Sequence, residues 1–195
     1  MRTVFRILLA LFLAGNVAHA AHTRARLILS ANTVKPGDTL WVGVDLKMDP
    51  GWHTYWKNSG DAGLPTKIDW QLPPGLSAGT VQWPLPDKFP PAEVTTYGYE
   101  GEVVLLVPLT VETNSNLPAG QVPLKAKLTW LECSADICIP GATNVATTLQ
   151  IGSTTQPSAD AGTINEWLAK APQTNTLFSF QSWWEAPAKD DTRPL

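Results

Sequence analysis

The chain has two cysteines, and they lie close together. Cys133 and Cys138 are separated by four residues, which is a spacing that one tight turn can bridge. Thiol–disulfide exchange needs one reachable thiolate and a second thiol near enough to resolve the mixed disulfide. A disulfide closing a loop of six residues would stabilise the fold by only about 2 kcal/mol in the chain-entropy model. A purely structural bond is therefore a weak explanation for the pair, and reversible exchange is the chemistry that it could perform.

The charges next to the cysteines favour one direction of that chemistry. Glu132 and Asp136 are acidic, and the sequence has no Lys or Arg between Lys127 and Lys170. Nearby negative charge raises the pKa of a thiol and disfavours the thiolate. A disulfide is a strong oxidant when its reduced form is stabilised as a thiolate. Since the acidic neighbours disfavour the thiolate, we expect this pair to act as a reducing carrier.

A β-strand is expected to position the first cysteine. Apolar and polar residues alternate from Leu124 to Trp130, which is the period of a half-buried strand. This strand would end where Cys133 begins, and the end of a strand is a rigid place for a reactive group.

The first twenty residues predict export. Arg2 and Arg6 precede an apolar run from Ile7 to Ala14, and Ala18-His19-Ala20 provides a small-x-small cleavage signal. We interpret residues 1–20 as a secretory signal peptide that is cut after Ala20. Two cysteines in an exported protein are either bonded to each other or actively kept reduced.

Charge and composition exclude several classes of function. Without the two arginines of the signal peptide the chain has 12 basic and 17 acidic residues, a net charge of −5, which argues against binding nucleic acid or an anionic membrane surface. Its 17 prolines are spread between short apolar runs, which is typical of many loops joining short strands. We expect no cofactor.

The pattern of short strands predicts an all-β fold. The clearest alternation is Leu40, Val42, Val44 and Leu46. The other expected strands are 24–30, 52–56, 67–70, 80–83, 103–110 and 145–151, with a loop at 57–65. Seven or eight strands at this spacing favour an immunoglobulin-like β-sandwich over a barrel. We expect this domain to cover residues 21–152.

A different pattern follows the domain. A polar linker leads to Ile164, Trp167, Leu168 and Ala171, which have the spacing of a short helix ending before Pro172. Residues 177–184 could form a last strand or a docking segment. The end of the sequence has no character of a stop, so we expect residues 153–195 to be a linker, helix and tail that continue in nature toward a membrane domain.

Several motifs together resemble a known family. They are Gly51-Trp52-His53-Thr54-Tyr55-Trp56, the loop from Asn58 to Pro65, Trp83-Pro84-Leu85-Pro86, Tyr97-Gly98-Tyr99, and Cys133-Ser134-Ala135-Asp136-Ile137-Cys138-Ile139-Pro140. This combination resembles the N-terminal periplasmic domain of the DsbD-type thiol:disulfide interchange proteins, and within them the ScsB-type relatives named for suppression of copper sensitivity. The resemblance runs from about residue 25 to residue 151.

The resemblance implies a function in the periplasm. Domains of this family take electrons from a membrane-embedded domain, by way of a thioredoxin-like domain, and pass them to periplasmic proteins of thioredoxin fold. By this likeness Cys133 and Cys138 form the redox-active pair, and the second cysteine attacks and holds the mixed disulfide. An aromatic cap over the pair matches Phe89. Tyr55 matches a tyrosine beside the pair, whereas His53 stands where the family has another aromatic residue.

Other functions stay open at this point. The pair could be a structural disulfide in a non-catalytic exported sandwich that binds a partner or copper. A Cu(I) or zinc site could combine Cys133, Cys138 and His53, since thiolates suit soft metals. A carbohydrate platform of Trp52, Trp56 and Trp183 has no polar residues to support it. Nothing in the sequence resembles the nucleophile turn of a cysteine hydrolase.

Overall fold

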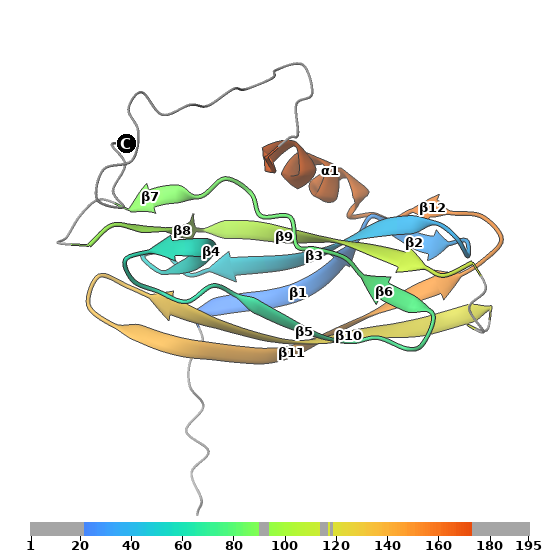
Figure 1. The fold of residues 1–195 in the computed structure, drawn as a ribbon, viewed down its shortest axis with the longest axis horizontal. Coiled ribbons are helices and arrows are strands. Elements are labelled where there is room, and N and C mark those ends of the chain that lie inside the picture. Colours follow the sequence, from blue (N-terminus) through green and yellow to red (C-terminus); the bar gives the residue numbers. More distant parts are fainter. Residues whose placement is uncertain (1–21, 90–93, 114–116, 118, 173–195) are drawn as a thin grey trace, which may run out of the picture.

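Two β-sheets facing each other form the body of the protein (Figure 1). The structure is a computed structural model that describes residues 22–89, 94–113, 117 and 119–172. The predicted signal peptide, residues 177–184 and Trp183 lie outside the described residues. The two-sheet arrangement confirms the predicted immunoglobulin-like sandwich, which the sequence favoured over a barrel.

The smaller sheet is antiparallel and has four strands. Their order across the sheet is β1 (Thr23–Leu29), β3 (Thr39–Met48), β9 (Glu102–Val111) and β6 (Leu76–Ala78). Alternate residues of β3, from Leu40 to Met48, are buried, and so is the matching set of β9. The alternation read from the sequence therefore defines the face that this sheet buries.

The larger sheet holds the two cysteines. Its path is β12 (Gln156–Pro157), β2 (Ala31–Val34), β11 (Cys138–Ile151), β10 (Gly120–Cys133), β4 (His53–Gly60), β8 (Thr96–Glu100) and β7 (Asp87–Phe89), and β5 (Lys67–Gln71) pairs with β10 beside this path. Strand β10 pairs first with β5 and then, at Glu132 and Cys133, with β4. The end of β10 is therefore fixed on both sides, by β4 and by β11.

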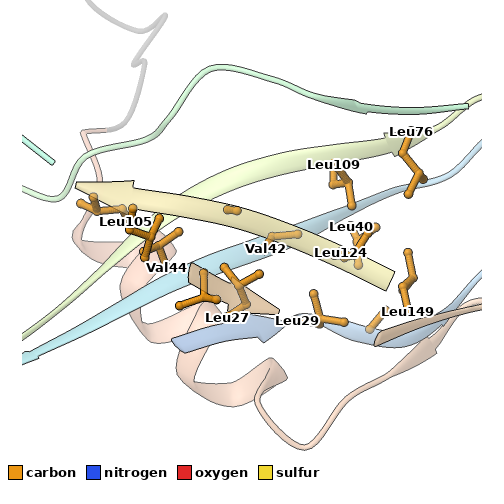
Figure 2. Packing of buried hydrophobic residues seen from close by; sticks show 14 of the residues in the cluster. Leu27, Leu29, Leu40, Val42, Val44, Leu76, Leu105, Leu109, Leu124 and Leu149 are labelled. Atoms are coloured by element: carbon orange, nitrogen blue, oxygen red, sulfur yellow. The ribbon is translucent and has the colours of Figure 1, made fainter. Parts of the chain in front are cut away.

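The core fills the space between the sheets. Figure 2 shows Leu27, Val42, Val44 and Leu105 of the smaller sheet and Leu124 of β10 as members of one buried cluster. Each of these side chains is at most 7% exposed, and Val42, Val44, Leu105 and Leu124 are fully buried. Burying one Leu or Val side chain stabilises the fold by roughly 1.5–3 kcal/mol, so this core dominates the stability of the domain.

One helix covers the outer face of the smaller sheet. Helix α1 (Ala161–Lys170) packs its buried residue Ile164 against Ile28, Val104 and Leu106. The helix expected before Pro172 is therefore confirmed. No helix among the described residues has the length and apolar character needed to cross a membrane.

Two of the expected local structures are wrong. Residues 80–83 do not form a strand; Gln82 alone makes a β-bridge with Leu106, and Pro84 and Pro86, which cannot donate to a ladder, follow at once. The loop expected at 57–65 begins later, because β4 continues to Gly60 and pairs there with Thr96.

Candidate active site

The two cysteines face each other at the tip of the β10–β11 hairpin. They are paired in the register of the two strands and joined by a disulfide, with their Cα atoms 4.0 Å apart. The backbone N–H of Ser134 donates to the carbonyl of Ile137 at 2.9 Å and closes the four-residue turn. The Ser134 hydroxyl accepts from the N–H groups of Asp136 and Ile137, both at 3.3 Å. The turn thus has its own hydrogen bonds and holds the pair at the strand ends.

The two cysteines differ in their exposure to solvent. Cys133 is 1% exposed, whereas Cys138 is exposed together with the three turn residues before it, 135–137. Ile137, directly before Cys138, is 56% exposed although it is apolar. An incoming protein can therefore reach Cys138, while Cys133 stays behind it.

A tyrosine and a histidine of β4 lie beside the buried cysteine. The register places His53 next to Cys133. The Tyr55 hydroxyl donates a hydrogen bond to Cys133 Sγ at 2.9 Å, and His53 Nε2 lies 3.2 Å from the same hydroxyl. The structure therefore brings together three of the residues selected from the sequence, in the order His53, Tyr55, Cys133.

Phe89 joins this group through the histidine. It ends strand β7, which pairs with β8, and its ring lies 4.5 Å from the His53 ring between centroids. Residues 90–93, which follow it, lie outside the described residues. The predicted role of Phe89 as a cap on the disulfide stays a prediction.

Two glycines that were not selected from the sequence hold the aromatic group in place. Gly63 has a φ of +98°, and a Cβ there would lie 2.3 Å from the Tyr55 ring. At Gly98 a Cβ would lie 2.0 Å from the carbonyl oxygen of Thr54 and 2.9 Å from the Phe89 ring. Both glycines lie in motifs that carry the family resemblance, which was the signal that could have identified them. A side chain at either position would displace the backbone or an aromatic ring.

Glu132 lies on the other side of the strand, in the interior. Its side chain is fully buried, and its two carboxylate oxygens accept hydrogen bonds from the His22 backbone N–H at 2.9 Å and from Trp130 Nε1 at 3.0 Å. Glu132 therefore ties the beginning of the described chain to the cysteine hairpin, whereas Asp136 lies in the exposed turn. Their predicted effect on the pKa of the thiols stays a prediction.

Burial sets the protonation of the two β4 side chains. It lowers the pKa of His53 from its ordinary 6.5, and the opposing effect of Glu100 is smaller. Burial also raises the pKa of Tyr55 above 10.0. At neutral pH the histidine is therefore mainly a neutral imidazole, and the tyrosine is a protonated phenol.

The lowered pKa of His53 predicts a loss of stability in mild acid. Since its folded pKa lies below the unfolded value of 6.5, the unfolded chain binds the proton first, and stability falls as the pH drops below 6.5 toward the folded pKa. We expect the urea midpoint to decrease between pH 7.5 and pH 5.5 by more in the wild type than in His53→Gln. Equal decreases in both proteins would contradict this prediction.

Among the described residues, no group of three or more His, Cys, Asp and Glu side chains is arranged to hold a metal ion. The set of Cys133, Cys138 and His53 suggested by the sequence thus does not form such a group, and the two sulfur atoms are bonded to each other.

Comparisons with known proteins find one matching family model and similar solved structures. A family model described as the N-terminal part of the thiol:disulfide interchange protein DsbD matches residues 24–150. Among solved structures, the N-terminal periplasmic domain of ScsB from Proteus mirabilis matches with a TM-score of 0.58 and 27% sequence identity, over 82% of this chain and 58% of that chain. The reduced N-terminal domain of Neisseria meningitidis DsbD matches with a TM-score of 0.39 and 15% identity, over 69% and 90% of the two chains. No curated protein matches.

Proposed function

Because the chain belongs to the family of DsbD N-terminal domains, we propose that it is a periplasmic thiol:disulfide interchange module that passes electrons to proteins of thioredoxin fold. One observation carries this proposal: an exposed Cys138 is bonded to a buried Cys133 whose sulfur accepts a hydrogen bond from Tyr55. A periplasmic location is supported by the predicted signal peptide and by the description of the similar ScsB domain as periplasmic.

The proposed reaction has two exchange steps. In the reduced protein the Cys138 thiolate attacks a disulfide of the partner; a bond forms between Cys138 and one partner sulfur, and the other partner sulfur leaves as a thiolate. Cys133 then gives up its proton and attacks Cys138 Sγ, which reforms the intramolecular disulfide and releases the second partner thiolate. The partner gains two electrons, and the Cys133–Cys138 pair loses them.

The surface around Cys138 suits contact with another protein. Ile137 is 56% exposed beside Cys138, and Leu64, which is 62% exposed, lines a pocket together with Pro140, two residues after Cys138. We propose that partners contact these apolar side chains while Cys138 reacts. The electrons that reduce the pair again would come from a membrane-embedded domain through a thioredoxin-like domain, in the same chain or in another.

The reduction potential of the pair tests the proposed function. The purified protein is equilibrated with glutathione and dithiothreitol buffers, and its free thiols are measured by alkylation. We expect a potential between about −180 and −270 mV, the range of thioredoxin-fold carriers and isomerases. A potential below about −300 mV, or unfolding of the domain on reduction, would instead identify a structural disulfide.

Phe89 is expected to shield the buried Cys133 side of the disulfide through its packing on His53. Phe89→Ala should then expose Cys133 and speed reduction of the pair by glutathione several-fold, because exchange rates depend on access to the sulfur. Phe89→Leu keeps most of the apolar volume and serves as the control. Rates are measured by alkylation and mass spectrometry at one pH, and equal rates for the wild type and Phe89→Ala would rule out shielding.

A further inference from the structure

We propose that His53 accepts the proton of the Cys133 thiol, through the Tyr55 hydroxyl, when Cys133 resolves the mixed disulfide. This inference rests on the proposed function. His53 does not contact the sulfur itself. It is a positioning residue that acts on the Cys133 proton through Tyr55, whose hydroxyl does contact the sulfur.

The contacts form one continuous chain of hydrogen-bonding atoms. Tyr55 donates its hydroxyl proton to Cys133 Sγ at 2.9 Å. Since that proton is used, His53 Nε2, at 3.2 Å, must be the donor to the tyrosine oxygen in the disulfide state. The two ring planes are nearly perpendicular, at 77°, and Phe89 packs on the histidine. These contacts restrain both side chains in the geometry that links them to the sulfur.

The same chain can run in the opposite direction after reduction. A Cys133 thiol would donate its S–H to the Tyr55 oxygen, and the Tyr55 hydroxyl would donate to a neutral His53 Nε2 that carries its proton on Nδ1. When Cys133 attacks Cys138 Sγ, the S–H proton moves to the tyrosine oxygen and the tyrosine proton moves to Nε2. The products are the disulfide, the partner thiolate and an imidazolium. Loss of the Nδ1 proton to solvent then leaves the Nε2–H tautomer inferred for the disulfide state.

The groups around His53 allow this role. Strand β8 places Glu100 opposite His53, β10 contributes Cys133, and β7 contributes the apolar ring of Phe89. The carboxylate of Glu100 favours the imidazolium, but burial outweighs it and leaves the pKa of His53 below 6.5. The neutral acceptor is therefore present at neutral pH.

Two neighbouring groups are poorer acceptors. Tyr55 has no negative charge to offer, because burial raises the pKa of its phenol. Glu132 is next to Cys133 in sequence, but both of its carboxylate oxygens accept N–H groups in the interior. Strand alternation directs Glu132 and Cys133 to opposite faces. Among the described groups around the sulfur, His53 is the base that is linked to it by hydrogen bonds, through the Tyr55 hydroxyl, and that is free to accept a proton at neutral pH.

A chromogenic disulfide separates the two exchange steps. The reduced protein is mixed with dithiobis(nitrobenzoate), which releases one coloured thiolate when Cys138 attacks and a second when Cys133 resolves the adduct. We expect the second phase to be slower in His53→Gln by about a hundredfold, the low end of general-base contributions, with the first phase changed less than about twofold. The wild-type second phase should lose rate in acid with a bend below pH 6.5, and His53→Gln should lack that bend.

Two further variants keep the inference falsifiable. Tyr55→Phe should slow the second phase to a similar extent, and the double variant should be no slower than either single variant, because both substitutions interrupt one path. His22→Gln keeps the backbone N–H that donates to Glu132 and changes only a side chain that stacks on Trp52 at 3.8 Å, so it should keep the wild-type profile. If His53 only supported the fold, His53→Gln would still show the bend in the pH dependence of the second phase.

The outcomes separate the two proposals. If His53→Gln keeps both the rate and the bend of the second phase, the proton path is wrong while the exchange function stands. If the wild type releases one coloured thiolate per molecule and never a second, the pair does not exchange in the proposed way. That result would overturn the proposed function and the proton path together.

Discussion

Replacing Cys138 with serine is expected to abolish electron transfer, whereas replacing Cys133 with serine should trap the partner. Cys138 is exposed and Cys133 is 1% exposed, so the first attack on a partner disulfide must come from Cys138. In Cys133→Ser that attack still occurs, but the chain has no second thiol to resolve the adduct, which can only revert through the partner's own thiolate. After alkylation of that thiolate we expect a mixed disulfide, seen as a band of added mass on a non-reducing gel after incubation with an oxidised disulfide isomerase of thioredoxin fold.

The two serine variants control for each other. Each removes the same disulfide and with it the same loop-closure stabilisation of about 2 kcal/mol, and the variants differ further in that the serine at position 133 is buried, so urea unfolding of both accompanies the trapping. Mass spectrometry of the trapped band should locate the linkage at Cys138. Adducts formed by Cys138→Ser and not by Cys133→Ser would reverse the roles of the two residues.

Local patterns in the sequence predicted the elements that carry the cysteines. The alternation from Leu124 to Trp130 lies in β10, and the strand around Val42 and helix α1 also formed as expected. The strand expected at 80–83 failed because periodicity over four residues does not determine pairing, and the prolines after it end the ladder.

The arrangement around Cys133 depends on contacts between distant parts of the chain. Tyr55 and Cys133 are 78 positions apart, and His22 and Glu132 are 110 apart. Such contacts follow from strand order, which periodicity does not encode, so it was the family resemblance that indicated Tyr55. The different exposure of the two cysteines and the buried carboxylate of Glu132 required the structure.

Glu132→Ala is expected to destabilise the domain strongly. The side chain is fully buried, and each carboxylate oxygen is the acceptor for one N–H donor. Its removal leaves the part-buried His22 N–H and the buried Trp130 Nε1–H without an acceptor, at about 1–3 kcal/mol for the buried donor, and adds a cavity. We therefore expect urea unfolding of the oxidised protein to show a loss of about 3 kcal/mol or more.

Two comparisons make the reason for that loss testable. Glu132→Gln keeps the side-chain volume but offers one acceptor oxygen, and its NH₂ group faces the second N–H donor. We expect the free energy of unfolding of this variant to fall by about 1–3 kcal/mol. Glu112→Ala removes an exposed carboxylate directly after β9 and should change stability by less than about 0.5 kcal/mol. If Glu132→Ala cost no more than Glu112→Ala, the carboxylate would not hold the beginning of the chain to the hairpin. The rigid mounting of Cys133 would then depend on its pairing with β4 and β11.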